Sequence, residues 1–219
     1  MYTYEHVQED ASRENLMPVV AVVNTKGGVG KTTTAMLLAA QAAASGHDAC
    51  VLDGDPQATA TKWVYAVEEA GEVLPFTVQV ANAGSIAHLS MVGERWVFID
   101  TPPGSSSTID AAINRADFTI IPTAAATADM WQTMPTISVL QGRPFAVLLT
   151  MARANTVLVR EVRQLLTEQA VSSFDAVVPL REVVKNLVGA ADLTSPDTGY
   201  AQVFAELDAA LAPATSPKE

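Results

Sequence analysis

The chain of 219 residues is poor in cysteine and in basic residues, and each shortage excludes a class of protein. Its single cysteine, Cys50, has no second cysteine to pair with, so neither a disulfide framework nor a cysteine-ligated cluster can form within the chain. Cys50 lies in an apolar run, where we expect a buried core residue. Lys and Arg number 13 against 24 Asp and Glu, a net charge of -11, which argues against a protein that coats nucleic acid with its whole surface.

Long apolar runs are also absent, and none approaches the ~20 residues that a membrane-spanning helix needs. Residues 1–17 are polar and acidic and lack the basic start and apolar stretch of a secretory signal. We therefore expect a soluble, cytoplasmic protein without membrane contact. The length suits one domain, which we place at residues 18–211 between a flexible N-terminal tail (1–17) and a disordered C-terminal tail (212–219).

Short apolar runs alternate with segments of helical period along the whole chain. Several of the runs are apolar at successive positions, as in strands buried on both faces of a parallel sheet. The alternation predicts an α/β fold, a mostly parallel twisted sheet flanked by helices on both faces. The expected strands are 19–23, 49–53, 76–80, 96–100, 118–122, 145–150 and 176–178, and the expected helices are 31–45, 57–70, 107–115, 127–140, 155–170 and 198–211.

A glycine-rich turn, "TKGGVGK", separates the first expected strand from the first expected helix. Such a turn presents backbone N–H groups and a helix N-terminus to an anion, and a lysine adds a point charge there. In that geometry Lys31 reaches the β and γ phosphates of a nucleotide, and the Thr32 hydroxyl binds Mg²⁺. The expected nucleotide-binding residues are Gly27, Gly28, Val29, Gly30, Lys31, Thr32 and Thr33.

Aspartates follow two other expected strands where each strand ends. "VLDGDPQ" contains Asp53 and Asp55, and "VFIDTPPG" contains Asp100. Mg²⁺ prefers oxygen ligands and keeps several waters, so a nucleotide site requires carboxylates at the ends of neighbouring strands. The pattern predicts a Mg²⁺ site involving Thr32, Asp53 and Asp100, with Asp100 in the Walker B position. The alternative is that Asp53 and Asp55 cap the helix that follows them.

The usual phosphate-loop pattern requires glycine at position 25, but this chain has Thr25 followed by Lys26. The stretch "KGGVGKT" resembles instead the K-G-G-x-G-K-[ST] loop of the ParA/MinD ATPases, which are P-loop NTPases of the deviant Walker A, SIMIBI type. "DGDPQATAT" resembles the D-x-D-P-Q-x-x-x-T stretch of ParA proteins, and "IDTPPG" resembles their D-x-P-P segment. The resemblance covers about residues 18–211 and is nearest to the short ParA-type plasmid and chromosome partition ATPases.

The resemblance implies a slow, partner-stimulated ATPase that uses ATP and Mg²⁺. By position, Lys31 serves the nucleotide of its own subunit, whereas Lys26 reaches across an ATP-bound homodimer to the partner's nucleotide. Asp55 orients or deprotonates the attacking water, and Asp53 and Asp100 hold Mg²⁺ through its water shell. For Lys26 the alternative is a solvated surface lysine.

The family also implies non-specific binding of double-stranded DNA by the dimer, association with the nucleoid, and hydrolysis stimulated by a ParB-type centromere-binding protein. Phosphate neutralisation by Lys and Arg drives such binding. Residues 143–185 carry a local charge of +2 on an otherwise acidic chain, although each base singly reads as an ordinary surface charge. The candidate DNA contacts are Arg153, Arg160, Arg163, Arg181 and Lys185.

Three other interpretations were considered; the residues disfavour the first and the last and leave the second open. Membrane positioning of the MinD kind requires a basic amphipathic C-terminal helix, whereas "GYAQVFAELDAALAPATSPKE" contains Lys218 as its only base. A related ATPase that positions a carboxysome or a chemoreceptor cluster would share all of these motifs. A dethiobiotin-synthetase-like ligase would use a similar loop but would have no use for a lysine acting in trans.

Overall fold

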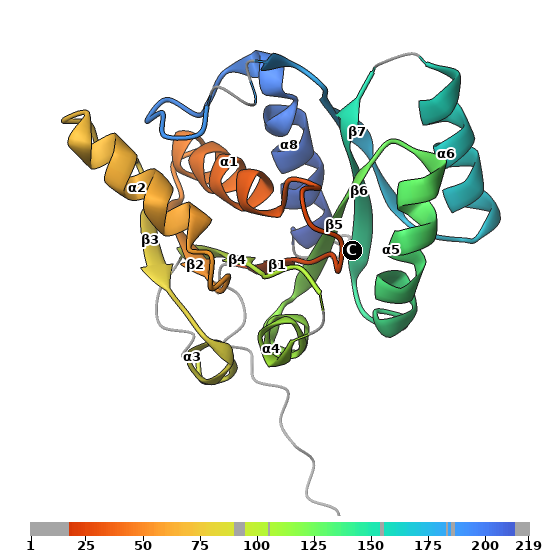
Figure 1. Ribbon diagram of the computed structural model, residues 1–219, viewed down its shortest axis with the longest axis horizontal. Coiled ribbons are helices and arrows are strands. Elements are labelled where there is room, and N and C mark those ends of the chain that lie inside the picture. Colours follow the sequence, from red (N-terminus) through yellow and green to blue (C-terminus); the bar gives the residue numbers. More distant parts are fainter. Residues whose placement is uncertain are drawn as a thin grey trace, which may run out of the picture.

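The computed structural model describes residues 18–89, 95–104, 106–153, 156–182, 184 and 187–212. The expected N-terminal tail lies outside these residues, as does the expected C-terminal tail beyond Ala212. Figure 1 shows one central sheet with helices on both sides.

Seven strands form the sheet within the described residues, in the order β3-β2-β4-β1-β5-β6-β7. Every recorded strand pair is parallel, which confirms the expected α/β architecture. The strands are β1 (Val19–Val22), β2 (Asp48–Asp53), β3 (Thr77–Val80), β4 (Arg95–Asp100), β5 (Phe118–Ala124), β6 (Phe145–Ala152) and β7 (Ser173–Pro179).

Two groups of helices cover the two faces of this sheet (Figure 1). On one face lie α1 (Lys31–Ala44), α2 (Thr59–Glu69) and α8 (Tyr200–Leu211). On the other face lie α3 (Ala83–Ala87), α4 (Ser107–Arg115), α5 (Thr127–Val139) and α6 (Val157–Glu168). A short 3-10 turn, η2 (Pro196–Thr198), precedes α8.

Strand β1 shows why a continuous apolar run suits this position. Val20 and Val22 belong to the core on the α1 and α8 side, whereas Val19 and Ala21 belong to the core on the α4 and α5 side. Successive side chains of a strand point to opposite faces, so a strand covered on both faces must be apolar at every position. All four residues are at most 2% exposed.

Most expected elements are confirmed, with differences at helix starts. α2 begins at Thr59 rather than at 57, because residues 55–58 form a turn in which Ala58 N donates to Asp55 O at 2.8 Å. α3 was not expected; it is one short turn of helix in which Asn82 and Ser85 form a capping box. Among the described helices, none combines the length and the apolarity needed to cross a bilayer.

The strand order places the turn after β1 at a distinctive point of the sheet. β1 lies between β4 and β5, so chain connections leave this point toward both edges. In open parallel sheets, ligands bind at the carboxyl ends of the strands where the order reverses in this way. The expected phosphate loop and both expected acidic strand ends meet at this edge, since Val22 and Asp53 are both register partners of Asp100.

Candidate nucleotide site

The expected phosphate loop runs from β1 into α1, and neighbouring strands hold its start. Asn24 is fully buried, and its Nδ2 donates to Pro122 O at 2.8 Å and to Thr133 Oγ1 at 3.2 Å. Its Oδ1 accepts from Lys26 N at 2.9 Å. Thr150 of β6 donates through Oγ1 to Val29 O at 2.9 Å. The loop is therefore fixed at both ends by polar side chains that are themselves held by β5, β6 and α5.

The loop glycines are required by backbone shape and not by packing against the protein. Gly28 and Gly30 have φ values of +74° and +92°, a region that side-chain-bearing residues seldom adopt. A Cβ at either position would meet no atom of the described residues within 4 Å. A Cβ at Gly27 would lie 3.8 Å from Pro103 Cβ, an ordinary contact. The backbone at Gly28 and Gly30 thus has open space on its Cβ side, which leaves room for a ligand beside the loop.

Lys31 is the first residue of α1 and is only 7% exposed. Its Nζ donates to Lys26 O at 3.0 Å, so the ammonium bends back over the loop. Burial lowers the pKa of the Lys31 ammonium, while the nearby Asp100 and Asp55 carboxylates act in the opposite direction. A buried, partly desolvated cation beside open N–H groups is suited to an anionic ligand.

Thr32 and Asp100 form the second polar element of the site. Thr32 Oγ1 donates to Asp100 Oδ2 at 2.6 Å, across 68 positions of sequence. Asp100 is fully buried, and its Oδ1 has no hydrogen-bond partner among the described residues. The pKa of Asp100 is raised to about 7, mainly by burial, and the Asp53 and Asp55 carboxylates act in the same direction. The Thr32 hydrogen bond and the Lys31 ammonium act in the opposite direction. Among the described residues, the second oxygen of this carboxylate has no donor, although the Lys31 ammonium partly offsets its charge.

The Asp100 Oδ1 atom and the Thr32 hydroxyl suit a Mg²⁺ ion that also has phosphate and water ligands. They do not suit a metal ion ligated by protein side chains alone. Within the described part of the chain, no group of three or more His, Cys, Asp or Glu side chains could hold a metal ion. Mg²⁺ in nucleotide sites characteristically takes one or two protein oxygens, with the remaining ligands from phosphate and water. The donor set therefore suits Mg²⁺ brought with a nucleotide.

Asp53 bonds to the first turn of α2, as the capping alternative to a metal role predicted, whereas Asp55 bonds to the turn before this helix. Asp53 Oδ2 accepts from Thr61 N at 2.8 Å and from Thr61 Oγ1 at 2.6 Å, which ties β2 to the first turn of α2. Asp55 Oδ1 accepts from Gln57 N at 2.9 Å. Because a carboxylate oxygen can accept more than one hydrogen bond, these contacts leave capacity for water-mediated binding of Mg²⁺. Asp55 is half-buried and lies within the electrostatic reach of both Lys31 and Asp100.

Lys26 is not a freely solvated lysine in this structure. Its Nζ forms an ion pair with Asp129, in the first turn of α5, and the two side chains are 28% and 17% exposed. A carboxylate at this point is also favoured by the N-terminal end of the helix dipole. Asp129, Asn24 and Thr150 were not identified from the sequence, because their role depends on contacts over 98 positions or more.

A cavity of about 250 Å³ adjoins the end of the phosphate loop. Gly30 and Thr33 line it on one side, and Met151, Pro179 and Tyr200 line it from β6, β7 and α8. The Tyr200 hydroxyl is 2.9 Å from Thr34 Oγ1, and burial raises the pKa of this phenol, so Tyr200 is a fixed neutral wall. No sequence motif marked this cavity, because its lining comes from four separate segments of the chain.

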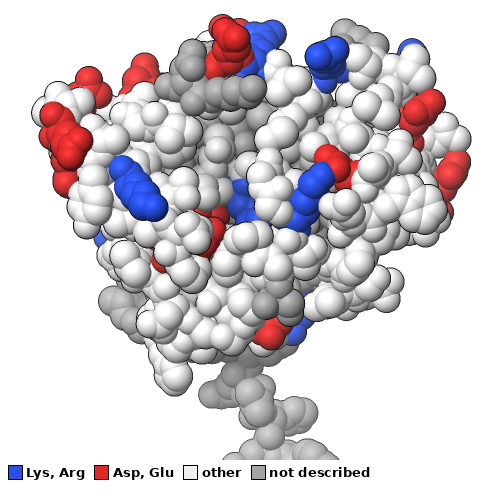
Figure 2. All heavy atoms as spheres, in the orientation of Figure 1, with Lys and Arg blue, Asp and Glu red and all other residues white. Residues whose placement is uncertain are grey.

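The candidate DNA-contacting residues do not all have free charges. Arg163 NH2 donates to Asp175 O, and its NH1 lies 3.7 Å from Asp175 Oδ1. Arg181 pairs with Asp197 at 2.8 Å. Arg153 and Arg160 are exposed, whereas Lys185 lies outside the described residues. In Figure 2 the described basic side chains on the face shown stand among acidic and neutral ones.

The family model for the CobQ/CobB/MinD/ParA nucleotide binding domain matches residues 20–192 of this chain. The match includes the phosphate loop, both acidic strand ends and most of the cavity lining. A protein named maintenance of carboxysome distribution protein A, from Gloeobacter kilaueensis, is 36% identical over 167 residues, which are 73% of this chain and 76% of that protein. The chain therefore belongs to the CobQ/CobB/MinD/ParA nucleotide-binding family, as its double-lysine loop predicted.

Other similar proteins connect this chain to more than one branch of the family. A protein named ParA from Rhizobium radiobacter is 32% identical over 108 residues, 48% of each chain. Among solved structures, an ATP complex of McdA from Cyanothece has a TM-score of 0.73 at 17% identity and covers 93% of this chain and all of that one. The septum site-determining protein MinD from Pyrococcus horikoshii, complexed with Mg-ADP, has a TM-score of 0.71 at 17% identity, covering 88% and 96%. At these identities the structures show a shared fold.

Proposed function

We propose that this protein is an ATPase that binds ATP with Mg²⁺, dimerises in the ATP-bound state, binds DNA without sequence preference and so distributes a cargo inside the cell. The proposal is carried by one observation, the double-lysine phosphate loop beside the Thr32–Asp100 pair, whose second carboxylate oxygen is buried and has no partner in the part of the chain that the structure describes. The ATP and Mg-ADP bound in similar structures support the choice of ligand.

The residues of the loop have separate tasks in this proposal. Backbone N–H groups from Gly27 to Thr33 and the α1 N-terminus would bind the phosphates. The Lys31 ammonium would leave Lys26 O and neutralise the phosphates, since it already lies buried at the loop. The cavity beside Gly30 would take the base, because its mostly apolar walls include a proline and a tyrosine ring.

Thr32 and Asp100 would hold Mg²⁺, which supplies charge neutralisation at the phosphates when it is bound. Asp53 would act through water as a further acceptor, while its bonds to Thr61 keep it oriented. Asp55 would orient the attacking water or take its proton, and its place in the turn fixed by Gln57 brings it close to Lys31. Because positioning does most of the work in phosphoryl transfer, we expect slow turnover without a stimulating partner.

Lys26 would change partners during the cycle. In the single chain its ammonium is paired with Asp129. A role in trans at the nucleotide of a second subunit requires this ion pair to open, and ATP would favour the dimer by offering phosphate oxygens in its place. Occupancy of the site would then set the oligomeric state.

The DNA-binding surface would use Arg153 and Arg160 first, since their charges are exposed. Arg163 and Arg181 would contribute only if DNA phosphates replace Asp175 and Asp197. Dimerisation doubles the number of basic groups, which gives a steep dependence on salt. A centromere-binding protein of the ParB type would then stimulate hydrolysis and release the DNA.

Two cargoes fit the sequence relatives. These relatives include both a ParA protein and a maintenance of carboxysome distribution protein A. Partition of DNA and positioning of a microcompartment would use the same nucleotide site and the same dimer. The cargo would then be decided by the partner protein.

The deciding experiment measures dimerisation and DNA binding with ATP, with ADP and without nucleotide. We expect ATP alone to give a dimer, by light scattering, that retards arbitrary duplex DNA at low salt. Lys31→Ala should strongly weaken nucleotide binding, whereas Lys26→Ala should retain nucleotide binding and lose the dimer. Lys62→Ala on α2 is the matched control, because this lysine is exposed and lies outside the phosphate loop. An ATP-loaded monomer that ignores DNA would instead favour a small-molecule enzyme on the same fold.

A further inference from the structure

Strand β6 contains a bulge where it borders the cavity beside the phosphate loop. Leu149 is the register partner of Val177, whereas Ala152 is the register partner of Pro179, so β6 has one more residue than β7 between these two pairs. The bulge therefore lies at residues 150 and 151. A β-bulge re-aims the side chain that it carries, and bulges are common beside active sites.

Met151 has an unusual backbone conformation within this bulge. Its φ is +51°, in the left-handed region that bulky side chains seldom adopt. Ala58 and Ala170 share this conformation, but each has a small side chain and lies beside a helix terminus. Met151 lies inside a strand, where no helix terminus accounts for it. Backbone strain of this kind persists only where the surrounding structure imposes it.

Hydrogen bonds on both sides of Met151 impose this conformation. Thr150 Oγ1 donates to Val29 O at 2.9 Å, which ties the preceding residue to the phosphate loop. Ala152 O accepts from Leu180 N at 2.9 Å, which ties the following residue to the end of β7. Between these two anchors, Met151 is held in the lining of the cavity.

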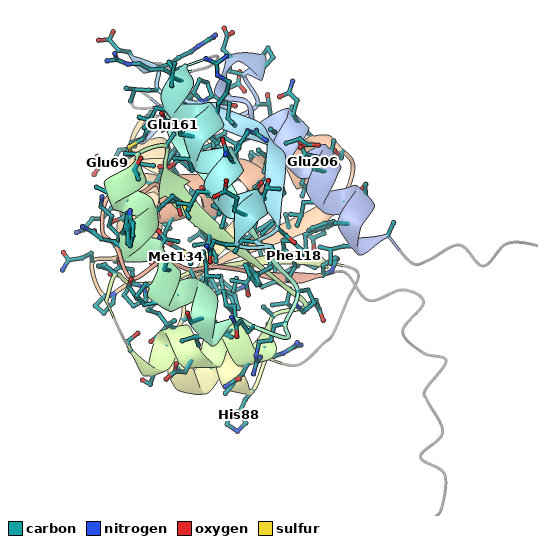
Figure 3. All side chains as sticks on the ribbon, turned by 90° about the vertical axis from the view of Figure 1, so that its right-hand side faces the viewer. Glu69, His88, Phe118, Met134, Glu161 and Glu206 are labelled. Carbon is teal, nitrogen blue, oxygen red and sulfur yellow. The ribbon has the colours of Figure 1, made fainter. Side chains whose placement is uncertain are left out.

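Met151 is more accessible than the other methionines that the structure describes. It is 42% exposed, whereas Met36 and Met130 are fully buried and Met134 is partly buried. Figure 3 shows Met134 on α5 and Glu206 on α8, on opposite sides of the sheet, and Met134 is not part of the cavity lining. The Met151 thioether is therefore open both to a ligand in the cavity and to small oxidants in solvent.

Oxidation of this thioether would change the chemistry of the cavity wall. Hydrogen peroxide transfers one oxygen atom to the sulfur: the O–O bond breaks, an S–O bond forms, the sulfur loses two electrons, and the peroxide leaves as water with both of its protons. The product, methionine sulfoxide, is polar. The hydroxyls of Thr150 and Tyr200, which also line the cavity, are already bonded, to Val29 O and to Thr34 Oγ1. The sulfoxide oxygen would be hydrated in the free protein and would lose this water beneath a bound base, which opposes binding.

We propose that Met151 is a reversible oxidation site through which peroxide lowers the affinity for nucleotide. The thioether packs against the base, and the sulfoxide weakens this contact. The placement of the base in this cavity rests on the proposed function. Cys50 does not compete for the oxidant, because it is 3% exposed and burial raises the pKa of its thiol, which disfavours the reactive thiolate.

Calorimetric titration with ATP and Mg²⁺, before and after peroxide treatment, tests the proposal. The peroxide is removed before titration, and peptide mass spectrometry measures the oxidised fraction at Met151. We expect oxidation to raise the Kd for ATP about tenfold, and methionine sulfoxide reductases for both epimers to restore it. Unchanged affinity after complete oxidation of Met151 would overturn the proposal. So would a Met151 that stays unmodified while Met134 is oxidised.

Two leucine variants assign the effect to one sulfur atom. Met151→Leu retains an apolar side chain at the strained position but cannot form a sulfoxide, so its Kd should be the same before and after treatment. Met134→Leu removes a methionine outside the cavity and should show the full peroxide effect. Met1, Met17 and Met91 lie outside the described residues and are present in both variants, so their oxidation cancels in the comparison. A peroxide effect that persists in Met151→Leu would assign the loss to another residue and refute the proposal.

Protection by nucleotide gives a second readout. Saturating ATP with Mg²⁺ should slow the oxidation of Met151 several-fold, because the base covers the thioether, and should leave the rate at Met134 unchanged. Equal rates at Met151 with and without ATP would contradict contact with the base. A chain that binds no ATP before treatment would refute the proposed function together with this regulation. A chain that binds ATP equally well before and after oxidation of Met151 would refute the regulation alone.

Discussion

The phosphate loop and helix α6 carry their charged side chains in opposite ways. In the loop region, Lys31 and Asp100 are buried and bonded to residues that are distant in sequence. On α6, Arg160 and Glu161 are exposed. Arg163 of the same helix has a partner, Asp175, which lies at the surface. The loop thus has a structure that its motif already implied, while α6 has faces whose chemistry follows only from what packs beside it. The following predictions test whether changes at the buried site have larger effects on stability and ligand binding than changes at the exposed side chains.

The largest expected effect is on the pH dependence of stability through Asp100, in protein free of nucleotide and Mg²⁺. The folded pKa of about 7 lies above the ordinary value of 3.8, so the stability contribution of protonated Asp100 is complete below about pH 4 and is lost as the pH rises through about 7. The loss is up to about 4 kcal/mol in the free energy of unfolding. Urea denaturation in EDTA between pH 4 and pH 8 should show this decline. The Asp100→Asn variant should show a flatter profile; the same slope in both would contradict a raised pKa at this residue.

Lys31→Ala should have the next largest effect. Because charge-assisted hydrogen bonds contribute about 1.5–3 kcal/mol each, we expect the Kd for ATP to rise about a hundredfold or more. Isothermal titration calorimetry with Mg²⁺ measures this change. Lys62→Ala on the exposed face of α2 should bind ATP as the wild type does. Comparable affinity in Lys31→Ala would show that the loop N–H groups suffice and that the lysine is not part of the site.

Gly54→Ala tests how closely the acidic strand ends are packed. A Cβ at Gly54 would lie 2.8 Å from Asp100 O and 2.9 Å from Thr108 Cγ2, so the ends of β2 and β4 must move apart. Overpacking of this kind costs about 1–3 kcal/mol. Thermal denaturation should show the loss, and ATP affinity should fall with it. The control is Gly84→Ala in α3, where the near atom is the side-chain oxygen of Asn82 at 3.2 Å. A similar loss of stability in this control would show that the contact with Asp100 is not the cause of the effect.

The smallest effects are expected for the arginines on and beside α6. Arg153→Ala and Arg160→Ala should each weaken DNA binding and reduce its salt slope by about 1, as for the loss of one phosphate contact. Arg163→Ala should leave the slope nearly unchanged, because its guanidinium is held by Asp175. Fluorescence anisotropy with labelled duplex DNA over a salt series, in the presence of ATP, measures the three slopes. A slope change in Arg163→Ala as large as in Arg160→Ala would show that DNA displaces Asp175.

Much of the fold could be predicted because its determinants are local. Continuous apolar runs mark the strands of a sheet covered on both faces, and helical periodicity marks most helices between them. The turn at residues 55–58 and the short helix α3 were missed at this level, since single turns carry little periodic signal. In α5 the interior Pro135 has no N–H to offer to the carbonyl of Trp131, yet packing keeps the segment helical.

The candidate site was predictable in part for the same reason. The Gly-Lys-Thr turn and the strand-end aspartates can be read as motifs, because the nucleotide chemistry restricts residue type and spacing within a few positions. The sequence allowed two interpretations of Asp53, a Mg²⁺ site or a cap of the following helix. The structure shows that the bonds from Thr61 to Asp53 are made. The partners of Lys26, Asn24 and Val29 could not be predicted from the sequence, because they lie in α5, β5 and β6, far along the chain.

The sequence by itself determined the class of fold, the phosphate loop and the acidic strand ends, because these depend on short-range periodicity and on residue types that one chemistry requires. Only the tertiary structure decided that Asp129 holds Lys26, that an oxygen of Asp100 is buried with no partner among the described residues, and that Trp131 is exposed. The physical reason is that burial and electrostatic environment are set by side chains brought together from distant positions. A motif names the groups of a site, whereas their surroundings fix the charge they carry and the partners they can reach.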